Sequence, residues 1–127
     1  MRDPRTFPTA SVASWSTHDT APIDAWWDDF SEGDRAQLAE SAGVRPDAGH
    51  EVRSLALLRH LYEARSDLAL VLAQELLGVR DRLNKPATVG QQNWTWRLPK
   101  PIEDLEVDAH TNARFTAIRA LVEETGR

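Results

Sequence analysis

The stretch Leu68-Ala69-Leu70-Val71-Leu72-Ala73 is a continuous run of apolar residues in the middle of the chain. A short apolar run without alternation is typical of a strand that is buried on both faces, as in a parallel sheet. The residues that follow, Gln74-Glu75-Leu76-Leu77-Gly78, predict a turn of helix that ends at the glycine. We therefore predict a buried strand of a parallel sheet over residues 68–73.

A second strand is predicted upstream, at residues 10–16, where small, β-branched and aromatic residues follow one another. Three helices are predicted between the two strands, at residues 20–30, 32–42 and 47–65. The last is the clearest, because apolar residues recur in it at three- and four-residue steps. Its apolar face is predicted to consist of Val52, Leu55, Leu57, Leu58, Leu61 and Tyr62.

Downstream of residue 78 the chain has no clear periodicity until its last helix. Residues 79–101 contain three prolines and a glycine and predict a long loop, a type that is usually functional or disordered in compact domains. The two tryptophans of this loop argue for order. A final helix is predicted over residues 108–125, followed by Gly126, and its apolar stripe consists of Phe115, Ile118, Leu121 and Val122.

The order of strand, helices, strand, loop and helix predicts an α/β fold, made of a βαβ unit and one more helix. A parallel sheet needs cover on both faces, and two strands do not form a stable parallel sheet alone. We therefore expect residues 1–127 to be a single, partial domain.

Composition limits the classes of function. The net charge of −5 gives no phosphate-neutralising surface for nucleic acid, and no stretch approaches the roughly 18 apolar residues of a membrane span. The N-terminus lacks the apolar core of a signal peptide, and the absence of cysteine fits the cytoplasm. No phosphate-binding or zinc-binding pattern is present, so we expect neither a metal nor a cofactor.

The pair His18-Asp19 directly follows the first predicted strand. Site residues of α/β folds lie at the carboxyl ends of parallel strands, so this pair is a candidate for chemistry. The alternative is that Asp19, or Thr20, caps the next helix and that His18 is an ordinary surface residue. Spacing alone leaves both interpretations open.

Two segments of the long loop are further candidates. Residues 82–88 follow the second predicted strand and would lie at the same end of the sheet as His18-Asp19, although this segment taken alone favours an ordinary polar loop. In residues 93–97, an extended backbone would place Trp94 and Trp96 on one side. We favour a structural role here, in which the indoles fill a gap beneath the loop and Arg97 bonds loop carbonyls.

Taken in series, these segments resemble one enzyme family. Ser16-Thr17-His18-Asp19-Thr20, Arg82-Leu83-Asn84-Lys85-Pro86-Ala87-Thr88 and Asn93-Trp94-Thr95-Trp96-Arg97 resemble, in order, segments of the bacterial 4-α-glucanotransferases, or amylomaltases. The resemblance covers nearly the whole chain. It implies the C-terminal fragment of a (β/α)8 barrel, including its last two strands.

The resemblance also implies an activity and roles. The family transfers α-1,4-glucan segments between maltodextrins by a retaining mechanism, with an aspartate nucleophile, a glutamate acid/base and a second aspartate that stabilises the transition state. Asp19 matches this second aspartate, while His18 and Asn84 match residues that bind the sugar. Trp94, Trp96 and Arg97 would support the loop.

The sequence departs from the family in two ways. Ala87 stands where the family usually has glycine, which costs about 1 kcal/mol if the backbone there has a positive φ. The family's nucleophile and acid/base lie upstream of anything in this chain, and nothing in the setting of Glu75 indicates a replacement. We therefore expect the isolated chain to be inactive and its partner to be the missing N-terminal part of the barrel. The alternative function is a non-catalytic glucan-binding or interaction module.

Overall fold

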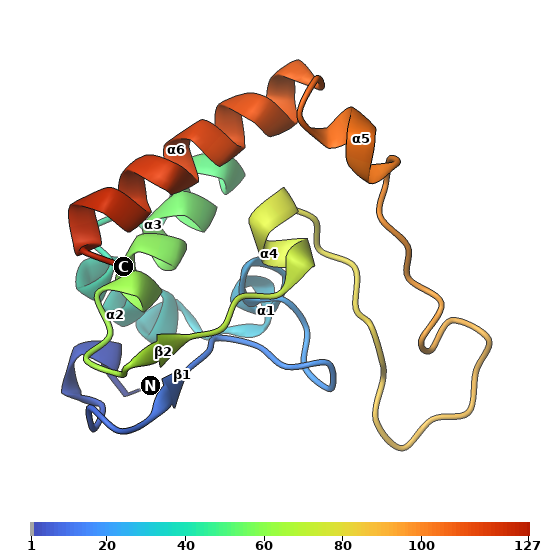
Figure 1. Cartoon of the computed structure of the whole chain (residues 1–127). Coiled ribbons are helices and arrows are strands. Elements are labelled where there is room, and N and C mark those ends of the chain that lie inside the picture. The colour runs from blue at the N-terminus through green and yellow to red at the C-terminus, as the bar shows by residue number, and fades with distance from the viewer. Residues whose placement is uncertain (1) are drawn as a thin grey trace.

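The computed structural model describes residues 2–127 and shows a helical body with a small sheet on one side and a long loop (Figure 1). The elements, in chain order, are η1 Pro4–Thr6, β1 Val12–Ala13, α1 Ile23–Trp26, η2 Trp27–Asp29, α2 Glu32–Ser41, α3 His50–Tyr62, β2 Leu68–Ala69, α4 Ala73–Leu77, α5 Ile102–Leu105 and α6 Ala109–Thr125.

The two strands β1 and β2 pair in parallel, with Val12 opposite Leu68 and Ala13 opposite Ala69. This confirms the predicted parallel pair joined by a helical crossover. Each strand has two residues, so the predicted ranges 10–16 and 68–73 were too long. Strand length depends on hydrogen-bonding neighbours, and among residues 2–127 each strand has one.

The prediction of a strand buried on both faces was wrong for the described chain. Ala69 and Val71 pack against buried clusters of the helical body, whereas Leu68 and Leu70 are 57% and 59% exposed. Successive side chains of a strand point to opposite faces, so the helices cover one face of the sheet. The other face, which we name the open sheet face, consists of Val12, Leu68 and Leu70.

The first predicted helix, residues 20–30, is shorter than expected and is divided into α1 and η2. Neither Asp19 nor Thr20 is its N-cap, because the helix begins after Pro22, whose ψ of 147° is extended. A proline ring restricts the residue before it to extended backbone, which excludes a helical start upstream. The alternative role of Asp19 as a helix cap is therefore wrong.

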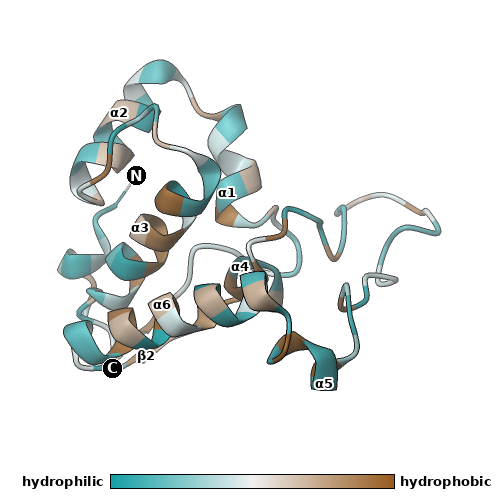
Figure 2. Ribbon diagram, turned by 90° about the horizontal axis from the view of Figure 1, so that it is seen from above, coloured by the Kyte–Doolittle hydropathy of each residue, from teal (hydrophilic) through white to brown (hydrophobic). Residues whose placement is uncertain are grey.

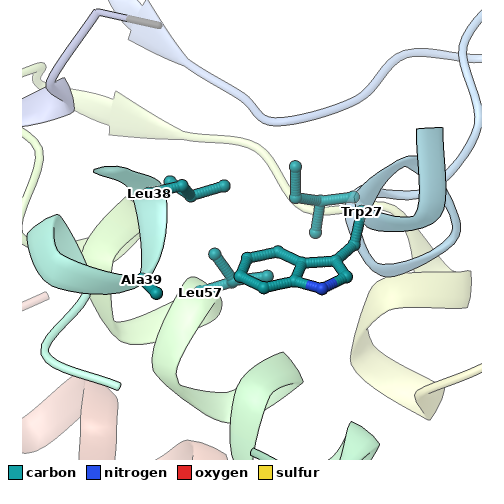
Figure 3. Close-up of a cluster of buried hydrophobic side chains, with 5 residues drawn as sticks. Trp27, Leu38, Ala39 and Leu57 are labelled. Carbon is teal, nitrogen blue, oxygen red and sulfur yellow. The ribbon is translucent and has the colours of Figure 1, made fainter. Parts of the chain in front are cut away.

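The cores of the helical body confirm most of the predicted apolar faces. Figure 3 shows the indole of Trp27 facing Leu38, Ala39 and Leu57, and Ile23 completes this buried cluster. A second cluster holds α6 against α3. Its buried members are Leu58, Tyr62 and Ile118, with Phe115, Leu121 and Val122 packed against them. At the start of α3 the predicted apolar face fails, since Val52 is 60% exposed.

Arg114 is buried between α6, α3 and α4, with 2% of its surface exposed. Its guanidinium donates to the carbonyl oxygens of Leu76 and Glu75, to Ser54 Oγ and to Glu51 Oε1, at 2.7–2.8 Å. Every one of these partners lies on α4 or α3. Arg114 therefore joins the last helix to the two elements that precede the long loop.

The last helix, α6, matches its predicted range closely. Asp108 is its N-cap and accepts from the Thr111 N–H, while Gly126 closes it in the left-handed conformation, with a φ of 72°. Residues 79–101, which we name the site loop, form no helix or strand and extend away from the helical body in both views (Figures 1 and 2). The short helix α5, which directly follows the loop, was not predicted.

Candidate active site

The segments after β1 and after α4 meet through their side chains. Asn84 Nδ2 donates to Asp19 Oδ1 at 2.8 Å, although the two residues are 65 positions apart. His18 Nε2 lies 3.2 Å from the other carboxylate oxygen of Asp19, Oδ2. The two segments that the sequence placed at one end of the sheet are therefore in direct contact.

A compact turn presents the Asp19 side chain to solvent. The Thr17 N–H donates to Thr20 Oγ1 at 2.9 Å, and the Thr20 N–H donates to the Thr17 carbonyl at 3.1 Å. The Asp19 N–H is directed to Thr17 Oγ1, at 3.3 Å. Three backbone N–H groups of the turn are thus bonded within it, and the Asp19 side chain stays 49% exposed. A half-exposed carboxylate with spare lone pairs can accept hydrogen bonds from ligand hydroxyls.

The site loop is held in shape by bonds across its two arms. The Trp94 N–H donates to the Leu83 carbonyl at 2.8 Å, and the Lys85 N–H donates to Asn93 Oδ1 at 3.0 Å. Asn93 also donates through Nδ2 to the Thr88 carbonyl at 3.0 Å. The Asn93 side chain therefore closes the loop that carries Asn84, a role that the sequence analysis missed. The sequence did offer a signal for this role, namely an amide side chain, Asn93, within a loop that contains proline and glycine.

Two residues of the site loop have positive φ without being glycine. These residues are Ala87, with φ 57°, and Trp94, with φ 62°. Ala87 stands where the resembled family usually has glycine. Its backbone does have the positive φ that favours glycine. An L-residue there costs about 1 kcal/mol, which the cross-loop bonds offset.

The Trp94 indole is not buried beneath the loop, as the predicted structural role would require. Trp94 is 61% exposed, and its ring lies 5.3 Å from the His18 ring, tilted by 37°. Trp96 is half-buried and lines a hollow of about 370 Å³ together with Arg82, Asn84 and Lys85. The positive φ of Trp94 breaks the extended geometry that would have put both indoles on one side.

Arg97 makes a single side-chain hydrogen bond in the described chain. Its Nη1 donates to the carbonyl of the preceding residue, Trp96, at 3.0 Å. This bond is local to the loop, in keeping with the predicted contact with a loop carbonyl. It does not tie the loop to the helical body.

Glu75 is buried and its carboxylate is fully engaged. Ser16 Oγ and the Ile23 N–H donate to Oε1 at 2.6 and 3.1 Å, and the Leu72 N–H donates to Oε2 at 3.2 Å. Glu75 is 4% exposed. It therefore joins the segment after β1, the start of α1 and the start of α4. Three hydrogen bonds and burial leave this carboxylate little capacity to bind a further ligand.

A second acidic group anchors the start of the site loop. Asp24 is buried on α1 and accepts from Arg53 Nε at 2.9 Å, while His50 Nε2 lies 2.9 Å from its other oxygen. Arg80, at the beginning of the loop, pairs with Asp28 and lies 3.6 Å from Asp24. The hydrogen bond from Arg80 lowers the pKa of Asp28 below its usual value.

Within residues 2–127, no group of three or more His, Cys, Asp or Glu side chains is arranged to hold a metal ion. Nor does any helix in this part of the chain have the length and apolar character needed to cross a membrane.

The fold is of the α/β class, with two parallel strands beside a mostly helical body. The structure matches the amylomaltase from Streptococcus agalactiae, solved in complex with acarbose, with a TM-score of 0.80 and 26% sequence identity. The match covers 98% of this chain and 23% of that amylomaltase.

The sequence leads to the same group of proteins. A family model described as 4-alpha-glucanotransferase matches residues 1–103, and the chain belongs to this family. The 4-alpha-glucanotransferases of Chlamydia muridarum and Chlamydia trachomatis are 25% and 24% identical to it over 118 and 119 residues. Each alignment covers 85% of this chain and 22% of the relative. The chain thus spans about a fifth of the length of the curated relatives that it matches.

Proposed function

We propose that this chain supplies one part of the active site of a 4-α-glucanotransferase, an enzyme that moves α-1,4-glucan segments between maltodextrins by a retaining mechanism. The observation that carries the proposal is the contact of Asp19 with both His18 and Asn84. Membership of the family supports the reaction class. In this proposal Asp19 stabilises the transition state, and His18 and Asn84 bind the sugar.

The chemistry of Asp19 follows from its surroundings. Its carboxylate receives one donor from Asn84 and keeps half of its surface open, so it can accept further hydrogen bonds from sugar hydroxyls. The reacting ring gains positive charge as it approaches an oxocarbenium ion, and hydrogen bonds to its hydroxyls strengthen in that state. A carboxylate fixed beside the ring therefore favours the transition state over the ground state.

We propose that the nucleophile and the acid/base come from the rest of the barrel, outside this chain. A retaining pair needs two carboxyl groups about 5–5.5 Å apart. Glu75 is committed to three donors, and within residues 2–127 the hydrogen-bond and ion-pair partners of the Asp19 side chain are Asn84 and His18. The open sheet face gives the missing part a place to pack, since it offers apolar side chains beside two unpaired strand edges.

The proposal is tested by incubating the chain with maltotriose, alone and together with a polypeptide that carries the other strands of the barrel. We expect no products from the chain alone. We expect glucose and longer maltodextrins from the mixture, and no products when Asp19→Asn replaces the parent chain. Transfer by the chain alone, or by the mixture with Asp19→Asn, would overturn the assignment of roles.

A second candidate function is a glucan-binding module without turnover. The observation that favours it is the exposed indole of Trp94 beside His18, because flat aromatic surfaces stack on sugar rings. Binding of maltodextrin by the chain, with no transfer in the mixture above, would select this function. The lack of cysteine fits the reducing cytoplasm, which we propose as the location in either case.

A further inference from the structure

Arg82 contacts both of the segments that form the site. Its Nη2 donates to the backbone carbonyl of Asp19 at 2.9 Å, and its Nε is 3.3 Å from the carbonyl oxygen of Asn84. Both acceptors are main-chain atoms of the two residues whose side chains bond to each other. The guanidinium therefore bridges the backbones of Asp19 and Asn84.

The Arg82 charge does not occupy the Asp19 carboxylate. Among residues 2–127, no carboxylate lies within ion-pair distance of Arg82, and the oxygens of Asp19 contact Asn84 and His18. An arginine bonded to the carboxylate itself would use the lone pairs that a ligand needs. Bonding the main chain instead fixes the residue and leaves its side chain available.

In the described chain, the hydrogen bonds between the turn at residues 17–20 and the site loop come from Arg82 and Asn84, and the rings of His18 and Trp94 also meet. The turn at residues 17–20 and the arms of the site loop are each bonded internally, and neither contains helix or strand at the contact. A planar guanidinium holds two acceptors in a fixed relation, which a flexible ammonium does not do. The role of Arg82 therefore depends on the planar shape of its guanidinium as well as on its charge.

We propose that Arg82 is a positioning residue of the site, which holds the Asp19 backbone against the site loop so that the Asp19–Asn84 hydrogen bond forms. The expected effect of Arg82 on the affinity for glucan rests on the proposed function, whereas its expected effect on the Asp19–Asn84 hydrogen bond does not. The test therefore has one arm without sugar and one arm with maltotriose.

The variants are Arg82→Met and Arg82→Lys in the full chain. Methionine keeps the apolar stem and removes both hydrogen bonds, and lysine can reach one carbonyl at a time. Arg82 is exposed, so the unfolding transition of both variants should match that of the parent. The control is Arg119→Met, which removes one positive charge from an exposed position on α6.

The arm without sugar uses NMR to follow the Asn84 side-chain amide and the cross-relaxation between the rings of His18 and Trp94. In Arg82→Met we expect the amide resonances to move toward those of a free amide and the ring contact to weaken, with a smaller change in Arg82→Lys and none in Arg119→Met. If both signals in Arg82→Met equal those of the parent, the inference is wrong.

The arm with maltotriose measures the affinity of the same chains. We expect Arg82→Met to bind about tenfold more weakly, the size expected for the loss of hydrogen bonds from a charged donor. A parent chain that does not bind maltotriose would contradict the glucan function, while a changed Asn84 amide would still support the positioning role. If the parent and Arg82→Met bind maltotriose with equal affinity, the claim that Arg82 supports glucan binding is wrong.

Discussion

The helical body and the site loop use their polar groups in opposite ways. In the helical body, the Arg114 guanidinium is buried and all three of its nitrogens donate to neighbouring elements. In the site region, Asp19 and Asn84 bond to each other while half of the Asp19 side chain faces solvent. The apolar groups differ in the same sense, since Leu57 is fully buried and Leu70 on the open sheet face is not.

The groups that stabilise the fold are therefore different from the groups that are free to bind a ligand. Buried groups with satisfied partners hold the helices together, but they have no capacity left to bind a ligand. The segments that follow the two strands keep that capacity, and they lie where sites of α/β folds are found. Substitutions in the two regions should therefore change different measurements.

The largest effect is expected from Arg114→Met. The change leaves two main-chain carbonyls, Ser54 Oγ and Glu51 without their donor, which should lower the free energy of unfolding by about 3–5 kcal/mol. Urea denaturation followed by circular dichroism measures it. The matched variant Arg119→Met, on the exposed side of the same helix, should stay within about 0.5 kcal/mol of the parent. A loss below about 1 kcal/mol in Arg114→Met would contradict its role.

A smaller loss of stability is expected from Glu75→Gln, which tests the buried carboxylate that connects the helical body to the segment before the site. The amide keeps one acceptor oxygen and presents an NH₂ group to a neighbouring donor, so the free energy of unfolding should fall by about 2 kcal/mol. Glu123→Gln on the exposed part of α6 is the control. Equal stability of Glu75→Gln and the parent would show that the buried carboxylate is dispensable.

A weaker, pH-dependent effect is expected from His60. Burial lowers the pKa of His60 below its ordinary 6.5, against the opposing influence of the Asp3 and Glu63 carboxylates and in the same direction as Arg5. The unfolded chain then binds the proton more readily, so stability rises with pH and falls as the pH drops from about 6.5 toward the folded pKa.

The check is the free energy of unfolding between about pH 7.5 and 5.5, in the parent and in His60→Gln. The variant should show a shallower decline across this window. The lowered pKa of Asp28 acts in a separate window, because its stabilisation is lost as the pH falls through its folded pKa, below about 4. If the stability of the parent and of His60→Gln declines in parallel with pH, His60 is not the cause of the decline.

The smallest change in stability is expected from Trp94→Ala. The indole is 61% exposed and the residue has positive φ, so the free energy of unfolding should move by no more than about 0.5 kcal/mol. Binding of maltotriose should nevertheless weaken, because the His18 ring loses its neighbour. A large loss of stability with unchanged binding would mean that Trp94 belongs to the structural region.

Periodicity was enough to place the two long helices, because their apolar stripes and end residues agree. Arg114 was missed even though it stands four residues before Ile118 on the apolar stripe, since an arginine on a helix is usually exposed. The strands were located but made too long, because strand length depends on neighbours that the sequence of one segment does not contain. The cap predicted at Asp19 failed for a local reason, namely the extended backbone of Pro22.

The candidate site could be predicted in part. Placing His18-Asp19 and residues 82–88 at one end of the sheet was correct, because parallel strands align their carboxyl ends. The surroundings of Trp94 could not be derived, since nothing in the local sequence indicates a positive φ at a tryptophan. The roles of Asp19, His18, Asn84, Trp94, Trp96 and Arg97 stay predictions.

The most direct test of the account maps the binding of maltotriose onto the chain by NMR. We predict that the largest shifts occur at His18, Asp19, Asn84 and the Trp94 indole, with little change on α6, and that Asp19→Asn reduces them. Shifts centred on the helical body, or no shifts at all, would contradict the claim that these segments form the glucan-contacting surface.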